Sequence, residues 1–314
     1  MNDKAPNNHS PCIFTLDLEE WFCSHREEAP EIGGVEKWPS YEHRAHLIVP
    51  RLLDYLAETG VRATFFVLGW YAERHPDIVR RIQQAGHAIG CHTYWHRNLF
   101  HLDENQLRDD IRHGKTVLED ITGLEMDSFR APNFSIYEHN LWALRVIAEE
   151  GFRYDSSIFP APRFDGGIPG FPSCPVKIEI DGLSLYELPT SIVSFFGKDL
   201  PIFGGGYFRI VPDLLINAGI RQLDSENKPV VFYFHPFDFD YEAPVFRYKF
   251  VNRFRRYANR RTLFGRVRRL LESRKWAVMD EYLSSLSYCS TPVEIKGLKV
   301  YKAISNNSGF APSG

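Results

Sequence analysis

Two histidines and a group of carboxylates follow short apolar segments of the chain, and their types suit metal-assisted chemistry. His92 and His96 are four residues apart, and upstream lie Asp17, Glu19 and Glu20. Neutral imidazoles and carboxylates are ligands for zinc and similar divalent metals. This set can hold one metal ion and still leave a carboxylate as a base. The pattern therefore indicates metal-assisted hydrolysis.

Each half of this set also has an ordinary structural interpretation. A pair such as His92 and His96 is spaced for one face of a helical turn. Such a pair alone is more often a structural or surface feature than a metal site. The acids fit a solvated loop with a helix-capping carboxylate equally well. The metal interpretation becomes the better one because both the histidine pair and the acidic group follow apolar, strand-like segments. On an extended chain Asp17 and Glu19 point the same way, so one can bind metal while the other takes a proton from water.

Two further residues stand at comparable places. Arg130 precedes Ala131 and Pro132, and the proline holds the backbone before it extended. An arginine there can keep a carboxylate ionised and oriented, or it can make a plain surface ion pair. His235 ends an apolar run and is followed by Pro236. It is placed for a general acid near neutral pH, with a hydrogen-bonded core histidine as the alternative.

Strand-like and helix-like patterns alternate in the first half of the chain. We predict strands at 12–17, 61–68, 87–91 and 152–155, and helices at 50–59, 76–85, 103–121 and 138–150. A repeat of about 25–35 residues is typical of βαβ units around a parallel sheet. No GxGxxG follows the first strand, which disfavours a dinucleotide site. The pattern predicts an α/β fold, a barrel-like (β/α) array with its chemistry at the carboxyl ends of the strands.

The second half breaks this rhythm. We predict a hairpin over 176–188, a flexible or tightly turning segment at 204–207, helices at 212–223 and 263–271, and a last buried strand at 230–234. The domain organisation that we predict has four parts. Residues 1–11 form a disordered tail, 12–240 the barrel, 241–290 a basic helical extension packed on the barrel, and 291–314 a C-terminal tail.

Composition and charge limit the classes of partner that the protein is expected to bind. The 314 residues are 44% hydrophobic and 25% charged with a formal net charge of −3, which predicts a globular protein without general affinity for nucleic acid. Residues 247–275 hold twelve Lys/Arg and one acid, so this segment either faces phosphate or a membrane surface or is a solvated helix face. The five scattered cysteines suggest neither disulfides nor a zinc ribbon. The polar N-terminus lacks the apolar run of a signal peptide, so we expect a cytoplasmic protein.

Four ordered stretches, FTLDLEEWF, HTYWH, FRAPNF and VFYFHPF, resemble the polysaccharide deacetylase family, carbohydrate esterase family 4, with its NodB homology domain. The stretches YDSS, GGGYFR and RYKFVNRFRRYANRRTLF resemble the branch that carries domain of unknown function 3473, which is common in exopolysaccharide and O-antigen assembly clusters. The resemblance spans about residues 12–285. It implies a distorted (β/α) barrel of the NodB type with a C-terminal helical extension.

The resemblance implies a metal site and a base. Asp17 matches the family's catalytic base. Leu18 occupies the position of the usual metal-binding aspartate, so Glu19 is the implied ligand and Glu20 the reserve candidate. The two histidines of HTYWH, His92 and His96, complete the implied site for one divalent ion. Zinc is the first choice, and cobalt and nickel also suit.

The remaining motifs imply the other roles. Arg130 matches the arginine that tunes the base, and His235 matches the catalytic acid. Asn133 stands where the family commonly has tyrosine, whose backbone N–H lies in the oxyanion hole. Asp155 falls in the variable fourth motif. Aromatic residues that can stack on sugar faces are Trp21, Phe22, Tyr94, Trp95, Phe134, Tyr207 and Phe208.

The implied activity is metal-dependent removal of an N-acetyl group from an amino sugar during surface polysaccharide synthesis. In the cytoplasm the substrate would be lipid-linked or nucleotide-linked, and residues 247–275 would make a peripheral membrane contact. Two alternatives stay open. One is a metal-dependent amidohydrolase for a small amide or ureide, and the other is a carbohydrate-binding protein without catalysis. The sequence does not fix the oligomeric state.

Overall fold

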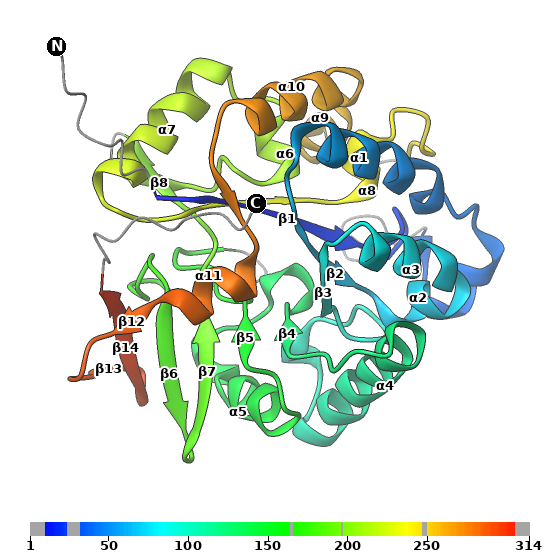
Figure 1. The fold of residues 1–314 in the computed structure, drawn as a ribbon. Coiled ribbons are helices and arrows are strands. Elements are labelled where there is room, and N and C mark those ends of the chain that lie inside the picture. The colour runs from blue at the N-terminus through cyan, green and yellow to red at the C-terminus, as the bar shows by residue number, and fades with distance from the viewer. Residues whose placement is uncertain (1–9, 24–31, 164–165, 196, 247–249, 305–314) are drawn as a thin grey trace, which may run out of the picture.

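A curved sheet of mainly parallel strands forms the centre of the molecule, and helices cover its outer side (Figure 1). The structure is a computed structural model that describes residues 10–23, 32–163, 166–195, 197–246 and 250–304. The parallel strands lie in the order β10, β1, β2, β3, β4, β5, β7. They are β1 (Cys12–Leu18), β2 (Thr64–Val67), β3 (Ala88–Cys91), β4 (Ser128–Phe129), β5 (Tyr154–Asp155), β7 (Leu183–Glu187) and β10 (Val230–Phe234). The predicted α/β array is confirmed.

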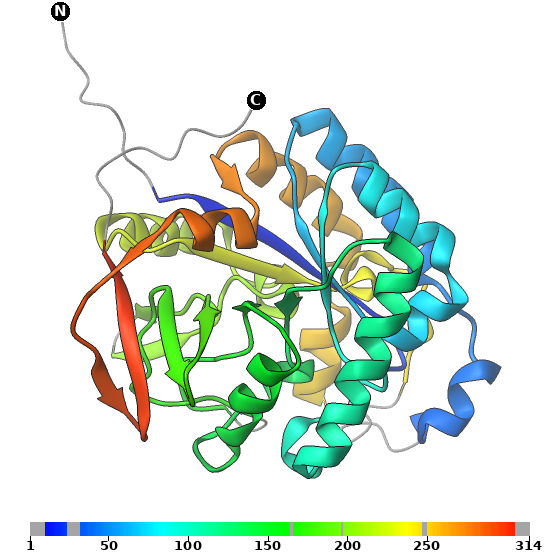
Figure 2. The same cartoon turned by 60° about the horizontal axis from the view of Figure 1, so that its bottom comes forward.

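Helices connect the parallel strands and pack their apolar faces on the sheet (Figure 2). In the first half they are α1 (Ala45–Thr59), α2 (Gly69–Arg74), α3 (Pro76–Gln84), α4 (Glu104–Thr122) and α5 (Trp142–Glu149), with 3-10 turns at Val35–Ser40, Leu99–His101, Pro132–Phe134 and Glu138–Asn140. The buried faces of α1 and α4 repeat at three and four residues, as in an amphipathic helix. The central strands β1 and β2 are buried throughout, because helices or other strands cover both of their faces.

Helix α1 begins earlier than the sequence predicted. We expected its start at Pro50, but it starts at Ala45 and carries Pro50 inside. The carboxylate of Glu20 accepts the backbone N–H groups of Arg44 and Ala45 at 2.9–3.1 Å. A distant carboxylate thus replaces the local N-cap that a sequence pattern would reveal. Burial raises the pKa of Glu20 to about 7, although these N–H groups lower it in part.

The second half adds further strands, antiparallel except for β11, and the helices of the basic extension. The strands are β6 (Val176–Ile180), β8 (Val193–Phe195), β9 (Lys198–Leu200), β11 (Trp276–Ala277) and β12 (Ser287–Tyr288). The helices are α6 (Gly205–Phe208), α7 (Asp213–Ser225), α8 (Pro236–Phe239), α9 (Phe250–Tyr257), α10 (Arg260–Glu272) and α11 (Met279–Ser285). Strands β6 and β7 form the predicted hairpin, and α10 packs against α1 and α8.

The predicted C-terminal tail is wrong over residues 293–304. This stretch forms β13 (Val293–Ile295) and β14 (Leu298–Ile304), and β14 pairs antiparallel with β6 (Figure 1). Lys296 and Gly297 both have positive φ, as a two-residue hairpin turn requires. Leu298 and Val300 are buried and alternate with exposed residues, a strand period that the polar end of the chain obscured.

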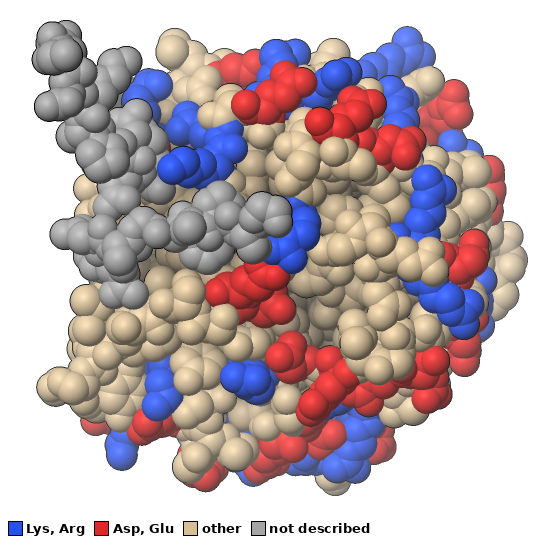
Figure 3. All heavy atoms as spheres, viewed as in Figure 1, with Lys and Arg blue, Asp and Glu red and all other residues tan. Residues whose placement is uncertain are grey.

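The other predicted domain boundaries can be compared with the structure only where residues are described. Of the predicted tails, residues 1–9 and 305–314 lie outside the described structure, as do 247–249 of the basic segment. The boundary at residue 240 stays a prediction. No helix within the described ranges has both the length and the apolar character needed to cross a bilayer. On the face shown in Figure 3, basic and acidic side chains are intermingled across the coloured surface.

Strand β14 should contribute measurably to stability. Val300 lies opposite Ile178 in the β14–β6 ladder and is fully buried. We expect Val300→Ala to lower the free energy of unfolding by about 2 kcal/mol, because buried methyl groups are lost and a cavity remains. Lys299→Ala, an exposed neighbour on the same strand, should change it by less than about 0.5 kcal/mol. Denaturant unfolding measures both, and equal effects would argue against the docking of β14.

Candidate active site

The polar residues selected from the sequence meet at one end of the sheet. Asp17 lies in β1, while His92, Arg130 and His235 directly follow β3, β4 and β10. The carboxyl ends of parallel strands share one edge, as in other (β/α) folds. Nε2 of His235 lies 3.8 Å from Oδ2 of Asp17 and 3.7 Å from Oε1 of Glu19. The structure thus brings these acids, histidines and the arginine into one site.

Glu19, His92 and His96 form a compact group with metal-ligand chemistry. Their ligand atoms all lie within 4.8 Å of one another, and all three residues are buried. Nε2 of His96 lies 2.7 Å from Oε2 of Glu19. Nδ1 of His92 donates to the carbonyl oxygen of Arg130 at 2.7 Å, since a carbonyl can only accept. This bond fixes the tautomer that leaves Nε2 of His92 with a lone pair for a metal.

The charge states of these groups suit a cation. Burial lowers the pKa of His92 to about 4, so its imidazole is neutral at neutral pH. Burial alone would raise the pKa of Glu19, but the charge and hydrogen bond of His96, followed by the charges of His235 and His92, lower it to about 2. A neutral imidazole beside an ionised carboxylate is the state in which these side chains bind metal.

A bent loop presents the two histidines, although their spacing would also fit one face of a helical turn. Thr93 and His96 have φ values of 61° and 51°, in the left-handed region. A carboxylate oxygen of Asp110, in α4, accepts the N–H groups of Tyr94 and Trp95 at 3.1 and 2.9 Å. These side-chain bonds take the place of the helical backbone pattern and hold the loop open.

Helix α4 approaches this loop very closely at Gly114. A Cβ at that position would lie 2.8 Å from the carbonyl carbon and oxygen of Thr93, closer than atoms can pack. Gly114 and Asp110 are one turn apart on the inner face of α4. The sequence analysis selected neither residue. A buried aspartate and a glycine at that spacing, both unfavourable inside a helix, were the pattern that could have indicated them.

Arg130 is fully buried and fixes the candidate base. Nη1 of Arg130 donates to Oδ1 of Asp17 at 2.8 Å and to Oγ1 of Thr15 at 2.7 Å. Its Nε and Nη2 donate to the carbonyl oxygen and hydroxyl of Ser156. The guanidinium also lies over the ring of Phe66, 4.2 Å from its centroid. Arg130 therefore makes a buried ion pair, and the surface pair considered from the sequence is excluded.

His235 is oriented by Asp238, three residues later in α8. Nδ1 of His235 lies 3.1 Å from Oδ2 of Asp238, and the same oxygen accepts the backbone N–H of His235 at 2.9 Å. Burial alone would lower the pKa of His235. The bond to Asp238, with the charges of Asp238, Glu19 and Asp17, outweighs burial and raises the pKa to about 9. His235 is thus protonated at neutral pH, as a general acid must be.

Asp238 is held by residues that the sequence analysis did not assign to the site. Nη2 of Arg209 lies 3.3 Å from Oδ1 of Asp238, and both side chains are buried. Arg209 also donates to the carbonyl oxygens of Arg255 and Arg256 at 2.9 and 2.8 Å. A Cβ at Gly205 would lie 2.0 Å from Oδ2 of Asp238. The segment 204–207, predicted as a flexible or tight turn, is thus mostly helix α6 packed onto the acid.

Part of the basic segment turns inward toward the loops around the site. Arg256 and Arg260 are buried. Arg256 donates to the carbonyl oxygen of Trp21 at 3.1 Å, and Arg260 donates to that of Asp240 at 2.9 Å. Arginine suits such positions because its planar fork satisfies several acceptors at once. These two side chains are neither a solvated face nor accessible to a phosphate.

Asn133 has the geometry of a strained turn. Its φ is 54°, and its side-chain Nδ2 donates to Oδ1 of Asn98 at 2.8 Å. Within the described ranges, no backbone acceptor is found for the Asn133 N–H. The preceding N–H, that of Ala131, donates to Oγ of Ser157 at 2.8 Å. The Asn133 N–H is therefore a candidate donor to a developing oxyanion.

Asp155 does not join the metal group. It lies in the segment that contacts Arg130 and Ala131 through Ser156 and Ser157. It is fully buried beside Glu187 and accepts the hydroxyl of Ser157. Burial raises the pKa of Asp155 to about 6 and, with the adjacent charge of Asp155, raises the pKa of Glu187 well above its usual value. Two adjacent buried carboxyl groups favour a state in which at least one of them is protonated. Ser156, the residue after Asp155, accepts two of the hydrogen bonds that Arg130 donates.

Most of the aromatic residues considered as sugar platforms belong to the core. Buried members of that set are Trp21, Phe22, Tyr94, Phe134 and Phe208. Trp95 and Tyr207 are half-buried and keep some accessible ring surface. A ring must expose a face to stack on a sugar, so these two remain candidates.

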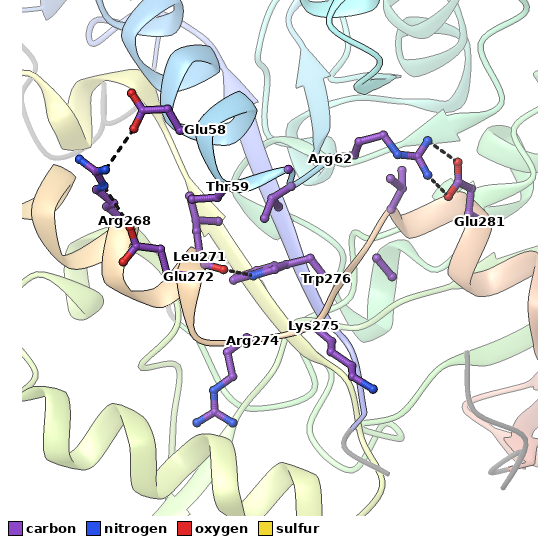
Figure 4. Close-up of a pocket in the computed structure, with 14 residues that line it drawn as sticks. Glu58, Thr59, Arg62, Arg268, Leu271, Glu272, Arg274, Lys275, Trp276 and Glu281 are labelled. Carbon is purple, nitrogen blue, oxygen red and sulfur yellow. Dashed lines mark hydrogen bonds and ion pairs between the residues drawn. The ribbon is translucent and has the colours of Figure 1, made fainter. Parts of the chain in front are cut away.

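The pocket shown in Figure 4 lies away from this site. It has a volume of about 450 Å³ and is bounded by the end of α1, by α10 and by β11, which pairs with the beginning of β1. Its charged walls pair with one another. Arg62 bonds Glu281 at 2.6 Å, and Arg268 lies 3.3 and 3.1 Å from Glu58 and Glu272. The pocket is at the amino ends of the strands, opposite the candidate site.

Comparison with known families divides the chain into two parts. Residues 40–154 match the polysaccharide deacetylase family, and residues 156–284 match a domain of unknown function (DUF3473). His92, His96 and Arg130 fall in the first part, and His235 falls in the second. Asp17 and Glu19 precede both. The candidate site therefore draws on both matched parts and on the strand before them.

Curated relatives and a solved structure carry deacetylase names. The chain is 42% identical over 95 residues to a peptidoglycan-N-acetylglucosamine deacetylase of Bacillus cereus, covering 30% of this chain and 34% of the relative. It is 37% identical over 101 residues to a chitin deacetylase of Colletotrichum lindemuthianum, covering 31% and 41%. The chain thus spans well under two thirds of these relatives. A crystal structure of a candidate polysaccharide deacetylase from Mycobacterium smegmatis superposes with a TM-score of 0.59 at 24% identity, covering 90% of this chain and 91% of that one, which shows a shared fold.

The carboxylate of Asp110 should influence metal affinity without touching the metal. We expect Asp110→Ala to weaken binding of Zn²⁺ at Glu19, His92 and His96 about 10–100-fold, because the histidine loop loses two hydrogen bonds. Asp109→Ala, an exposed neighbour on the same helix, is the matched control and should bind as the wild type does. Competition with a chelating dye measures both affinities. Equal affinities would mean that Asp110 does not position the loop.

Asp238 should set the alkaline limit of activity. His235 with a raised pKa is protonated below about pH 9 and loses its proton as the pH rises through that value. Asp238→Asn removes the hydrogen-bonded charge, so the pKa falls and the alkaline limb of kcat/KM moves to lower pH. Glu242→Gln, at an exposed side chain just after α8, should leave the limb in place. An unmoved limb in the Asp238 variant would contradict this assignment.

Proposed function

Because the chain belongs to the polysaccharide deacetylase family, we propose that it hydrolyses the N-acetyl amide of an amino sugar with the help of one divalent metal ion. One observation carries the proposal. Asp17, a candidate base, and His235, a candidate acid, lie 3.8 Å apart beside the group Glu19, His92 and His96. An amide bond needs a base on the attacking water and an acid on the leaving nitrogen.

The residues present fit a metal ion. Glu19, His92 and His96 offer one carboxylate oxygen and two imidazole nitrogens within 4.8 Å, a donor set that suits zinc, with cobalt or nickel as alternatives. An ion bound there would polarise the substrate carbonyl and acidify the attacking water. Glu20, the reserve ligand, points away from this group and caps α1 instead, so we assign the carboxylate ligand to Glu19.

The protein side chains then divide the proton transfers. Oδ2 of Asp17 accepts the proton of the attacking water, while Oδ1 stays engaged with Arg130. The backbone N–H of Asn133 donates to the oxyanion as the carbonyl carbon becomes tetrahedral. Nε2 of His235 gives its proton to the leaving nitrogen, and Asp238 on the opposite ring nitrogen holds the imidazole in place. Acetate and a free amino sugar are the products.

The substrate belongs to surface polysaccharide synthesis in this proposal. The resemblance to the branch with domain of unknown function 3473, typical of O-antigen and exopolysaccharide clusters, supports it. We propose a lipid-linked or nucleotide-linked sugar, in the cytoplasm, where the five free cysteines suit a reducing environment. Exposed cations of the basic segment that could meet lipid or nucleotide phosphate are Arg253, Arg261, Arg268, Arg269 and Lys275.

Metal analysis combined with acetate release tests the function. The wild type should release acetate from N-acetylated amino sugars and should lose this activity after chelation. Glu19→Gln should bind metal at the catalytic group at least about 10-fold more weakly and lose activity in parallel. His235→Ala should keep the metal and lose about 10²–10⁴-fold in kcat, the usual contribution of a general acid. His139→Ala, at an exposed histidine, should keep both metal and rate.

The outcomes separate the remaining functions. A protein that metal neither occupies nor activates would overturn the mechanism and leave a carbohydrate-binding role. Metal at the catalytic group without acetate release from any sugar would redirect the search to small amides and ureides. The replacement of the usual tyrosine by Asn133 makes that second enzyme class worth assaying in parallel.

A further inference from the structure

A second group of metal-ligating side chains lies beside the beginning of α1, apart from the catalytic group. It consists of Glu20, His43 and His75, whose ligand atoms all lie within 4.8 Å of one another. We call it the α1 cluster. Glu20 follows β1, His43 precedes α1, and His75 lies between α2 and α3. These helices lie next to one another on the right of Figure 1, so the cluster joins three segments that are distant in sequence.

Polar atoms next to this cluster lack hydrogen-bond partners in the described ranges. Within the cluster, Nδ1 of His43 and Nε2 of His75 lie 2.8 Å apart and share one hydrogen bond. Around them, two buried polar atoms find no hydrogen-bond partner in the described ranges, the hydroxyl of Tyr71 and Nδ1 of His46. Both rings stack on His75, at 4.7 and 5.2 Å between centroids. A buried polar group without a partner is unfavourable, so a further polar species beside these rings would stabilise the folded state.

The donor types of the cluster suit a metal cation as that species. Glu20 is buried, and the guanidinium of Arg44 next to it binds Asp240 instead, at 2.5 Å. The Glu20 carboxylate accepts the backbone N–H groups of Arg44 and Ala45 and keeps lone pairs for a further partner. A carboxylate and two neutral imidazoles can together coordinate a divalent metal ion.

We propose that Glu20, His43 and His75 form a second binding site, for a divalent ion of the zinc class. Two imidazoles and a carboxylate are a donor set that zinc accepts. Zinc ligands at about 2.0–2.1 Å in a tetrahedron lie about 3.4 Å apart, so the rings of His43 and His75 must separate by only about 0.6 Å. The hydroxyl of Tyr71 or a water can take the fourth position.

The ion at this site would act on structure and not on substrate. It would tie the segment before α1 and the corner between α2 and α3 to the end of β1. Since Glu20 is adjacent to Glu19, the α1 cluster would also fix the backbone that presents the catalytic ligand. The inference does not depend on the proposed deacetylase activity, because none of its three residues belongs to the catalytic group.

Counting metal in variants tests the site. The protein is stripped with chelator, reloaded with Zn²⁺ and desalted, and metal per folded chain is measured by mass spectrometry. We expect two ions per chain in the wild type and in the exposed control His139→Ala. We expect one ion in His75→Gln and in His43→Ala. The double variant His92→Ala/His96→Ala, which lacks the catalytic group, should retain one ion and lose it when His75→Gln is added.

Cobalt provides a second measurement that is independent of activity. Co²⁺ added to His92→Ala/His96→Ala should give visible d–d absorption that saturates at one equivalent and disappears in the triple variant. One ion per wild-type chain that His75→Gln leaves in place, or no ion in the double variant, would overturn the proposal. If His75→Gln fails to fold, as judged by circular dichroism, His43→Ala and the cobalt spectrum of the double variant still decide. Failure of acetate release with two ions bound would refute the catalytic function alone.

Discussion

The buried ion pair between Arg130 and Asp17 is the interaction on which the site depends. It lies at the junction of β1, β4 and β5, where Arg130 bonds Asp17, Thr15 and Ser156 together. Two charges in this environment are tolerated because four guanidinium N–H groups have acceptors in the described structure and the guanidinium also contacts aromatic rings. Removing one partner would leave the other charge buried and uncompensated, which typically costs about 3–5 kcal/mol. The same contacts that hold the strands in register therefore orient the candidate base.

The acid side of the site depends on the second half of the chain in a similar way. His235 is oriented by Asp238, Asp238 is bonded by Arg209, and Arg209 donates to carbonyl oxygens at the end of α9. Close backbone approach at Gly205 makes this succession sterically feasible. The part that matches the domain of unknown function thus supplies and supports the acid. It is not an appendage to a complete barrel.

The consecutive acids Glu19 and Glu20 show how one turn of backbone can serve two purposes. Just past the end of β1, neighbouring side chains point to opposite sides of the chain. Glu19 joins His92 and His96, whereas Glu20 turns to the start of α1 and the histidines beside it. The backbone at Glu19 and Glu20 is therefore held on one side by the sheet and the catalytic group. On the other side it is held by α1.

The sequence by itself determined the elements and the inventory of reactive groups. Apolar runs such as 230–234 and helical periods such as that of α4 depend on local patterning, so the α/β array and the strand-end position of Asp17, His92, Arg130 and His235 could be predicted. The polar end of the chain hid β13 and β14, because a short edge hairpin carries few apolar residues and gains its stability from β6. Boundaries shifted where a distant group replaced a local one, as Glu20 does for α1.

Only the tertiary structure decided which groups act together. Asp110 and Arg209 meet their partners through fold-specific contacts, from elements far from the residues they hold, whereas Asp238 reaches His235 within the first turn of α8. The spacing of Asp110 and Gly114 in α4 marks unusual helix positions but does not identify the loop N–H groups that Asp110 accepts. Nothing in local sequence marks an arginine that faces a carboxylate 29 residues later. The same is true of charge state, since burial and neighbouring charges hold His92 neutral and His235 protonated. Residue types determine which chemistry is available. Long-range packing decides which residue takes which role, because pKa, tautomer and orientation depend on neighbours that come together only when the chain folds.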